Sequence, residues 1–200
     1  MRVVAGTARG RRLAAPAGSA TRPTSDRVRE AVFNALASAR LIEDATVLDL
    51  FAGTGALGIE ALSRGAAHAT FVERDRAALA VVASNLEATG LRDRATLVHD
   101  GAERVLAGAS SPVDLALVDP PYAYDRWAEL LDLLRARFVV VESDRTMQFG
   151  SRWRVVREKR YGGTVVTFLE GVGASGAGSG GDEPAGDGGC GAAPAGQTMI

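Results

Sequence analysis

The chain has 200 residues, of which 46% are hydrophobic and 24% are charged, and its formal net charge is −1 at pH 7. This composition is ordinary for a soluble globular protein and predicts one core of about 150 residues. The single cysteine, Cys190, excludes an internal disulfide and a metal site built from several cysteines. No apolar run approaches the ~20 residues that cross a bilayer, and the start lacks a signal-peptide pattern, so we expect a cytoplasmic protein without a membrane span.

The small net charge hides a strong asymmetry along the chain. Residues 1–40 hold eight arginines and two acids, a net charge of +6, and residues 152–160 hold five basic residues and one acid, a net charge of +4. Arginine supplies all but one of the 23 basic residues, and its planar guanidinium suits phosphates. The two segments therefore predict a polyanionic partner. The alternatives are a solvated surface with acids nearby in the fold and a general arginine-for-lysine habit of the source organism.

The N-terminal 20 residues predict a small basic hairpin or arm, with short strands at Arg2–Ala5 and Arg11–Ala14. Residues 23–26 offer N-cap candidates for a helix that continues to about Arg40. The apolar face of this helix is predicted to contain Val28, Val32, Leu36 and Ala39.

From Val47 onward, strands and helices alternate. The predicted strands are Val47–Phe51, Ala69–Glu73, Ala95–Val98, Val113–Val118 and Phe138–Val141, followed by an antiparallel pair near Trp153–Arg157 and Val165–Glu170 on the far edge of the sheet. The predicted helices are Ala56–Ser63, Arg76–Thr89 ended by Gly90, about Ala102–Leu106, and Tyr124–Leu134. Near-continuous apolar strands alternating with helices predict a doubly wound α/β fold with a mainly parallel, seven-stranded sheet covered on both faces.

Composition divides the chain into three parts. We expect a basic arm over residues 1–24, a folded domain over residues 25–171 and a tail over residues 172–200. The tail consists mostly of Gly, Ala, Ser and Pro, so it cannot bury enough apolar surface to offset the entropy of ordering and is predicted to be disordered. Cys190 lies in it and is interpreted as an incidental exposed thiol.

A glycine-rich loop leaves the first core strand and enters a helix at residues 49–58. Gly53, Gly55 and Gly58 permit a tight turn and a close backbone approach, and the helix N-terminus leaves N–H groups free to meet a polar ligand. Glu73 ends the next strand, where a carboxylate can accept both ribose hydroxyls of a nucleoside. Asp49 at the strand end suits a cation such as the amino group of S-adenosylmethionine.

The three glycines also match the dinucleotide fingerprint GxGxxG. An acid four residues before the first glycine is poorly suited to a pyrophosphate, and no nicotinamide partner is recognisable. S-adenosylmethionine is therefore favoured as cofactor over NAD or FAD, and a purely structural glycine turn is the third interpretation.

Asp100 ends the third core strand, from where a carboxylate can accept a hydrogen bond from an adenine amine. The alternative role is a helix N-cap, and His99 beside it is interpreted as a structural or rim residue. The predicted cofactor site is completed by four neighbouring residues, Phe51, Thr54, Arg74 and Gly101.

The segment Asp119-Pro120-Pro121-Tyr122 follows the apolar run Val113–Val118 and predicts a rigid slot for a planar amine. The prolines fix φ near ~−65° and have no N–H, so their carbonyls can point at a ligand. If Asp119 and the Pro120 carbonyl each accept one N–H of a base amine, its lone pair points at a methyl donor. Tyr122 would stack on the base, a contact worth ~1–3 kcal/mol. Asp119 and Gly53 are expected to face one pocket, and the alternative is a proline-terminated strand with an N-capping aspartate.

These residues resemble RsmD-type enzymes. The resemblance covers about residues 1–170 and rests on residues 2–13, 21–33, 47–66, 119–122 and 160–166. It implies a class I, Rossmann-like, S-adenosylmethionine-dependent methyltransferase that methylates N(2) of one guanine in bacterial 16S rRNA. It also implies 16S rRNA as partner, within an assembling small ribosomal subunit. We further expect a monomeric protein that binds no metal.

Other classes share parts of this pattern. A DNA adenine methyltransferase usually needs a sizeable target-recognition domain, whereas only ~45 residues precede the core here, and a short basic arm suits a structured RNA. Protein-glutamine methyltransferases carry asparagine where Asp119 stands. The alternatives that stay open are an adenine-N(6) methyltransferase acting on nucleic acid and a non-catalytic RNA-binding module, which could dispense with Asp49, Glu73 and Asp119.

The arginines of the first basic segment are the candidate RNA contacts. Arg9, Arg11, Arg12 and Arg22 are predicted to contact phosphates. Arg27 and Arg29 either join them or form salt bridges within the helix.

Overall fold

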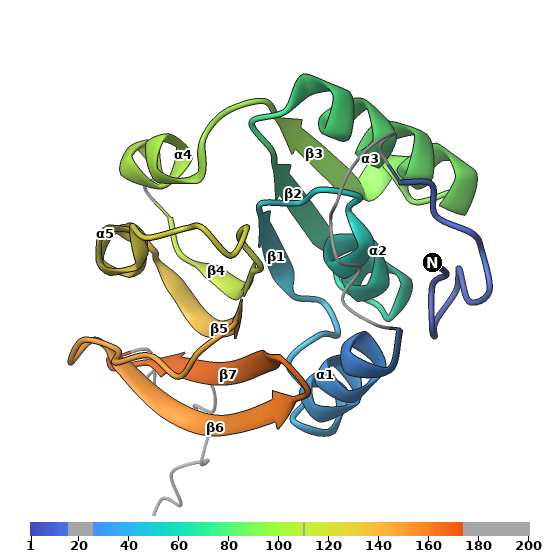
Figure 1. The fold of residues 1–200 in the computed structure, drawn as a ribbon. Helices are drawn as coiled ribbons and strands as arrows, with labels where there is room; N and C mark the ends of the chain where they lie inside the picture. Colours follow the sequence, from blue (N-terminus) through green and yellow to red (C-terminus); the bar gives the residue numbers. More distant parts are fainter. Residues whose placement is uncertain (16–25, 110, 174–200) are drawn as a thin grey trace, which may run out of the picture.

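The computed structural model describes residues 1–15, 26–109 and 111–173. Seven strands form one sheet in the order β3-β2-β1-β4-β5-β7-β6 (Figure 1). Their bounds are β1 Thr46–Leu50, β2 His68–Val72, β3 Ala95–Val98, β4 Val113–Val118, β5 Ala136–Ser143, β6 Trp153–Tyr161 and β7 Thr164–Gly171. Strands β1 to β5 are parallel, and β7 is antiparallel to both β5 and β6. The predicted mainly parallel, seven-stranded sheet with a hairpin at its edge is confirmed.

Helices cover both faces of the sheet. They are α1 Asp26–Ser38, α2 Ala56–Ser63, α3 Arg76–Thr89, α4 Ala102–Gly108 and α5 Trp127–Leu133, with a short 3-10 helix at Arg92–Arg94. One apolar cluster packs α1, α2 and α3 on the sheet, and a second packs α4 and α5 on the opposite face (Figure 1). In the described ranges, no helix is both long enough and apolar enough to cross a membrane.

Local signals explain which element boundaries were predictable. Helix α3 begins after Asp75, whose side chain accepts the N–H groups of the first turn, and ends at Gly90 in the left-handed region with φ 72°. The helix predicted from Tyr124 begins only at Trp127, because the Tyr124 N–H bonds to the Pro121 carbonyl in a turn. The expectation that Ala39 lies on the buried face of α1 is wrong, since it is exposed beyond the helix end.

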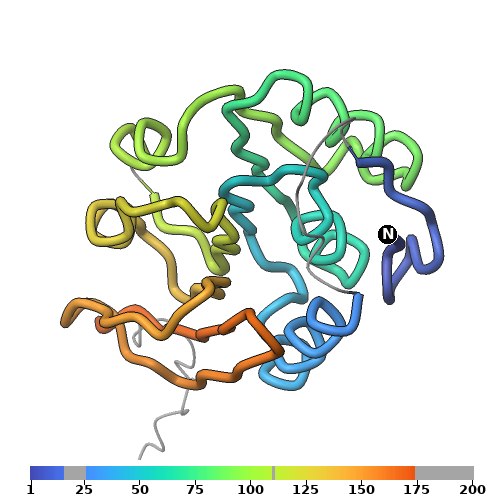
Figure 2. Tube along the Cα trace, viewed as in Figure 1, coloured from blue at the N-terminus to red at the C-terminus, as the bar shows by residue number. Residues whose placement is uncertain are grey.

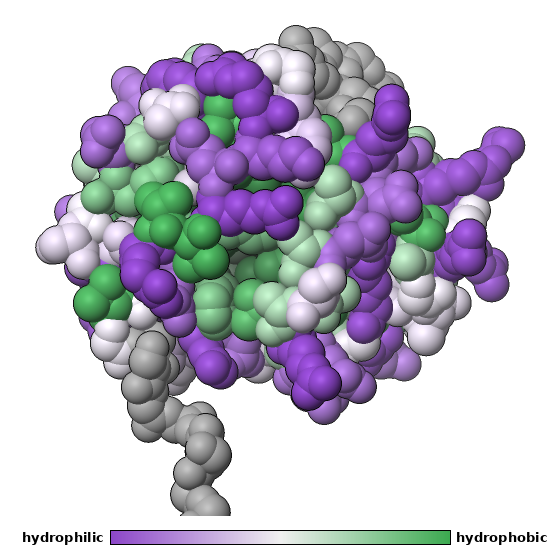
Figure 3. Space-filling model, turned by 90° about the horizontal axis from the view of Figure 1, so that it is seen from below, coloured by the Kyte–Doolittle hydropathy of each residue, from purple (hydrophilic) through white to green (hydrophobic). Residues whose placement is uncertain are grey.

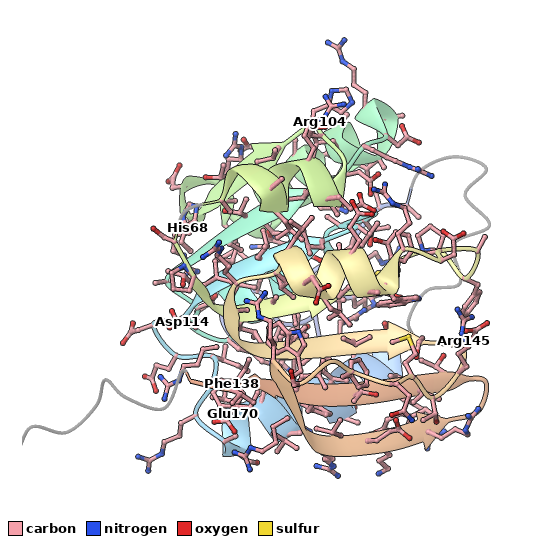
Figure 4. All side chains as sticks on the ribbon, turned by 90° about the vertical axis from the view of Figure 1, so that its left-hand side faces the viewer. His68, Arg104, Asp114, Phe138, Arg145 and Glu170 are labelled. Carbon is pink, nitrogen blue, oxygen red and sulfur yellow. The ribbon has the colours of Figure 1, made fainter. Side chains whose placement is uncertain are left out.

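The two ends of the sheet differ in what they carry. Figure 4 shows His68 and Asp114 at the end where β2 and β4 begin, and Arg145 at the opposite end, where β5 finishes. At the first end Asp114 ties β4 to β1, because its carboxylate accepts the N–H and the hydroxyl of Thr46 at 2.9 and 2.7 Å. The other end collects the carboxyl ends of the parallel strands, where open α/β sheets bind ligands.

The N-terminal arm, residues 1–15, packs into the core instead of forming a regular hairpin. The predicted pairing of the two segments is confirmed, because an antiparallel bridge joins Arg2 to Arg12 and backbone bonds run from Val3 to Arg11 and from Leu13 to Met1. Their prediction as regular strands is wrong, since the pairing stops at this one bridge. The side chains of Val3, Ala8 and Leu13 are buried in the cluster that also contains α1, α2 and α3. Figure 2 shows the arm lying beside α2 and α3.

Polar side chains of α2 and α3 hold the backbone of this arm. Glu60, which is fully buried, accepts two arm N–H groups at 2.7 and 3.0 Å, and Ser63 accepts another at 3.0 Å. The Asn85 amide accepts the N–H of Ala14 at 2.8 Å and donates to its carbonyl at 3.1 Å. These bonds satisfy backbone groups that a strand ladder would otherwise satisfy, which explains why the arm needs no regular hairpin.

Arg29 of α1 is fully buried beside Glu60. Its guanidinium bonds to Asp26 at 2.9 Å and to the carbonyl of Arg2, and its Nε lies 3.7 Å from Glu60. Glu60 also pairs with Arg64 at 2.7 Å. The prediction that Arg29 contacts RNA phosphates is wrong, because its guanidinium is fully buried and already bonded. A buried charge is stable only with partners of this kind. The alternative, a salt bridge within the helix, is confirmed by its pair with Asp26.

Replacing Glu60 with alanine is expected to destabilise the fold. The substitution removes the acceptor of two arm N–H groups and one of the two carboxylates beside the buried Arg29 charge, and breaking a buried pair in this way costs about 3–5 kcal/mol. Urea denaturation followed by circular dichroism measures the loss. Glu30→Ala, which removes an exposed carboxylate from α1, is the control and should change the free energy of unfolding by about 0.5 kcal/mol or less. Equal losses in the two variants would contradict the anchoring role.

Candidate functional site

A cavity of about 1650 Å³ opens at the carboxyl ends of the parallel strands. Its walls come mainly from the loops that follow β1 to β4, from the end of β5 and the start of β7, and from single residues of the arm and of the helices. All the predicted catalytic residues and most of the predicted cofactor residues line it: Asp49, Phe51, Gly53, Thr54, Glu73, Arg74, Asp100, Gly101, Asp119, Pro120, Pro121 and Tyr122. The prediction that Asp119 and Gly53 face one pocket is confirmed.

Asp49 is the most deeply buried acid of this cavity, with 1% of its surface exposed. Its carboxylate accepts the N–H of Gly58 at 2.9 Å. Gly58 is the third residue of α2, and the N-cap Gly55 has no side chain to bind such a group, so Asp49 caps the helix from β1. Burial raises the pKa of Asp49 to about 8, the Gly58 bond opposes this rise, and the charges of Asp119 and Glu73 add to it. Such a cluster of acids favours a cationic ligand.

The glycines of the loop divide into two groups. Gly53 lines the cavity and has φ 54°, in the left-handed region that glycine adopts without strain. Gly55 and Gly58 lie behind the cavity wall, where an added Cβ would be 2.9 Å from Val82 and 2.3 Å from Phe71. The expectation that they contact the ligand directly is therefore corrected: Gly55 lets the start of α2 approach α3, and Gly58 lets α2 approach the sheet. The N–H of Gly58, predicted to be available to a ligand, is taken by Asp49.

Glu73 fixes the shape of the glycine loop. One carboxylate oxygen accepts the N–H of Gly53 and the other accepts the N–H of Asp75, both at 2.9 Å. A carboxylate oxygen has two lone pairs, so each keeps acceptor capacity toward the cavity that Glu73 lines. The same residue can thus position the loop and bind a ligand hydroxyl.

Asp100 lies at the cavity edge after β3. Its carboxylate accepts the N–H of Gly101 at 2.7 Å and lies 3.5 Å from Arg104. The N-cap of α4 is Gly101, which makes no side-chain cap bond, so the alternative of Asp100 as helix N-cap is wrong. His99 is an exposed residue whose ring lies 3.0 Å from the Arg74 carbonyl, in agreement with a rim position.

Aromatic residues form the wall between β1 and β4. Tyr122 is 48% exposed, while the ring of Tyr124 lies 5.1 Å from Phe51 and 5.4 Å from Trp127 in edge-to-face contacts. The Tyr124 hydroxyl donates to Glu103 at 2.8 Å. Together these contacts hold the segment after Asp119 against α4, which makes the slot rigid.

Sequence reasoning missed Glu103 and Tyr124. Burial and the bond to Glu103 raise the pKa of Tyr124. Burial alone would raise the pKa of Glu103, but backbone and Tyr124 hydrogen bonds, with the charges of Arg126 and Arg74, lower it overall. Each residue had a signal, since Tyr124 follows the slot directly and Glu103 lies in the first turn of the helix after Asp100.

The described residues of the cavity walls form no cluster of metal-ligating side chains. Among the residues that the structure describes, no group of three or more His, Cys, Asp or Glu side chains is arranged to hold a metal ion. The polar groups of the cavity are carboxylates, hydroxyls, backbone groups and arginines, which suit an organic ligand with hydroxyl and amino groups.

Comparison with known proteins identifies the family. The family model described as "Conserved hypothetical protein 95" matches residues 1–170. The chain belongs to this family. It is 38% identical over 183 residues to the Bacillus subtilis protein named "Putative rRNA methyltransferase YlbH", covering 85% of this chain and 98% of that one. It is 46% identical over 134 residues to Ribosomal RNA small subunit methyltransferase D of Escherichia coli strain K12, covering 67% and 66%.

A solved structure gives the same result for the fold. The Escherichia coli protein described as "Putative methyltransferase yhhF" superposes with a TM-score of 0.76 at 39% identity, covering 86% of this chain and 97% of that one. The resemblance to RsmD-type enzymes is confirmed. The family match begins at the arm and ends before the Gly-rich tail, so the arm belongs to the family's common length.

The other arginines predicted to bind RNA and described by the structure lie outside the cavity walls. Arg9, Arg11 and Arg12 are exposed on the arm, and Arg27 is exposed on α1. Arg22 lies outside the described residues, as do the predicted N-cap candidates at residues 23–25 and the tail from residue 174.

Asp49 is expected to make stability depend on pH. Its pKa is about 8 in the folded protein against the ordinary 3.8, so between about pH 4 and pH 8 the folded chain holds a proton that the unfolded chain has lost. Folding stability from this group therefore falls as pH rises through that window. Asp49→Asn keeps an acceptor for Gly58 but cannot titrate. The variant should gain stability relative to the native chain as pH rises.

Urea denaturation at about pH 5, 6, 7 and 8 measures this difference. Asp93→Asn, at an exposed position on the 3-10 helix, is the control, and its offset from the native chain should stay constant. A constant offset for Asp49→Asn as well would refute the raised pKa.

Proposed function

We propose that this chain transfers a methyl group from S-adenosylmethionine to the exocyclic amine N(2) of one guanine in 16S rRNA. The observation that carries the proposal is the meeting of Asp49, Glu73 and Asp119 in one cavity with the slot at residues 119–122. Membership of a family with relatives named ribosomal RNA methyltransferases supports rRNA as the substrate class.

The cavity residues fit S-adenosylmethionine, which supplies a methyl group on a positively charged sulfur. Asp49 would lose its proton and hold the ligand's amino group, because a cation offsets the burial that raises its pKa. Glu73 would accept hydrogen bonds from the ribose hydroxyls, and Asp100 would accept one from the adenine amine. Phe51, Thr54, Arg74 and the backbone of Gly53 and Gly101 complete the proposed donor site.

The slot after β4 fits the acceptor base. Asp119 and the carbonyl of Pro120 would each accept one N–H of the guanine amine, which turns its lone pair toward the methyl carbon. The N–C bond forms as the C–S bond breaks, the sulfur keeps the bonding pair, and the amine proton passes to Asp119 or to water. Pro121 fixes the backbone, and the half-exposed Tyr122 would stack on the base. The rate gain comes from positioning and electrostatics.

The arm supports RNA as the partner. Its backbone is bound to Glu60 and Asn85, and Asn85 also donates to the carbonyl of Thr54 in the glycine loop at 2.9 Å. One side chain thus holds both the arm and the donor loop, so the backbone that carries Arg9, Arg11 and Arg12 is anchored beside the proposed donor site. We propose that these three, with Arg22 and Arg27, contact phosphates.

The wider proposal follows the same reasoning. Residues 25–171 form the methyltransferase domain and residues 1–24 its RNA-binding arm, with residues 172–200 as a tail without a role in catalysis. The protein acts as a monomer in the cytoplasm, on rRNA within an assembling small subunit.

Methyl transfer from labelled S-adenosylmethionine to 16S rRNA and to small subunits tests this function. We expect N(2)-methylguanosine as the product by nucleoside mass spectrometry. Asp119→Ala should lower kcat by about 10²–10³-fold, as loss of one preorganised group does, with the S-adenosylmethionine Kd within a few-fold of native. Asp132→Ala, an exposed position on α5, is the control.

Each contrary outcome removes a different part of the proposal. Methyladenosine as the product would refute guanine and favour the adenine-N(6) alternative. Transfer unaffected by Asp119→Ala would refute the mechanism. RNA binding without transfer by the native chain would favour the non-catalytic module.

A further inference from the structure

Strand β6 places the second basic segment of the sequence on the open edge of the sheet. Among the strands that the structure describes, β6 pairs only with β7, and every residue from Arg154 to Arg160 is exposed. Figure 3 shows this face of the molecule, on which hydrophilic side chains surround a small hydrophobic patch. Val155 and Val156, 49% and 53% exposed, precede the basic half of the strand.

Two cations of β6 lie on the same face of the sheet as α1. Arg157 pairs with Phe168 and Lys159 with Val166, and both partners belong to the apolar cluster that packs against α1. Side chains two residues apart share one face of a strand, so Tyr161 continues the row. The Lys159 ammonium lies 5.1 Å from the centre of the Tyr161 ring. We call Arg157, Lys159 and Tyr161 the β6 stripe.

The charges of the β6 stripe are not held in direct ion pairs. Arg154 pairs with Glu170, and Glu158, the only acid of β6, has its carboxylate bonded to two threonines. Among the residues described, no acidic side chain forms an ion pair with Arg157 or Lys159. Both exposed cations can therefore contact an anionic partner without first breaking a salt bridge.

The β6 stripe leads to the mouth of the cavity. Tyr161 pairs with Thr164, the first residue of β7, and Thr164 lines the cavity. Helix α1 separates the stripe from the arm, because Arg29 contacts the arm while Ala35 and Ala39 border the groove that Arg157 lines. Figure 2 shows this order of arm, α1 and β6. An RNA chain whose target nucleotide enters the cavity would thus meet cations on both sides of α1.

We propose that the β6 stripe is a second RNA-binding surface, on which Arg157 and Lys159 contact phosphates next to the target nucleotide. The inference rests on the proposed function, since it takes the cavity as the place of the target base. An acidic protein would also match the charge, but continuity with a nucleotide-binding cavity favours RNA. The arm and the β6 stripe would then bind two separate parts of one RNA.

Paired substitution of the two cations tests this surface. Arg157→Gln with Lys159→Gln removes two charges from β6, and Arg135→Gln with Arg137→Gln removes two from exposed positions near the start of β5, at the far end of the sheet. Binding to a 16S rRNA fragment is measured from low to high salt by filter retention. The β6 variant should bind on the order of tenfold more weakly at low salt, with a log–log salt slope shallower by about 1–2.

The kinetics of transfer give a second measurement. The β6 variant should show a raised KM for RNA, with kcat at saturating RNA and the Kd for S-adenosylmethionine close to native. The control pair should match the native chain in all these values, and circular dichroism checks the fold of both variants.

The outcomes separate this inference from the function on which it rests. If the native chain transfers no methyl group to rRNA, the proposed function fails. If it does and the β6 variant keeps the native salt slope, only the β6 surface is refuted. Weaker binding to small subunits with unchanged affinity for naked RNA would also refute RNA contact and assign the stripe to a ribosomal protein.

Discussion

The buried carboxylate of Asp49 is the interaction on which the site depends. By accepting the N–H of Gly58 it joins the end of β1 to the first turn of α2. This close approach requires that Gly58 has no Cβ, because one would strike the ring of Phe71. Burial and the nearby charges of Asp119 and Glu73 keep a proton on Asp49 in the ligand-free protein. A positively charged ligand favours the ionised form of Asp49, so the cavity selects cationic ligands by charge as well as by shape.

A second set of polar contacts makes the arm part of the catalytic body. Glu60 and Asn85 bind arm backbone groups from α2 and α3, and Asn85 reaches the glycine loop as well. The helices that present the donor loop are therefore the helices that hold the arm. A short basic segment needs this kind of rigid support to orient a large RNA, since phosphate contacts fix register only when their own positions are fixed.

Local signals were sufficient for most of the fold. Asp75 and Gly90 mark both ends of α3, and the apolar run at Val113–Val118 gives β4 without correction. The mainly parallel sheet followed from alternating strands and helices, because connections of this kind leave few topologies. The cavity could be anticipated for the same reason: the motifs that carry chemistry all stand directly after parallel strands, and those ends meet in space.

The errors share one cause, which is that the deciding partner lies far away in the sequence. The arm looked like two strands because its own pattern alternates, but the N–H groups of Ala5, Ala8 and Ala14 bond to side chains 55 to 71 residues away, which limits the pairing between its two segments. Arg29 looked like a surface cation because Glu60, its partner on α2, is not visible from the local sequence. Glu103 and Tyr124 meet across 21 residues. Burial of a polar residue is a tertiary property, so periodicity alone cannot reveal it.

The central claim is that Asp49 is protonated in the ligand-free protein and loses its proton when a cationic ligand binds in the cavity. Proton release on binding S-adenosylmethionine measures this directly. Titration calorimetry at about pH 6.5 in buffers of different ionisation enthalpy gives the number of protons released per ligand bound. The account predicts release of about one proton, because the ligand's charge returns Asp49 to its ionised form. Binding without proton release would contradict it.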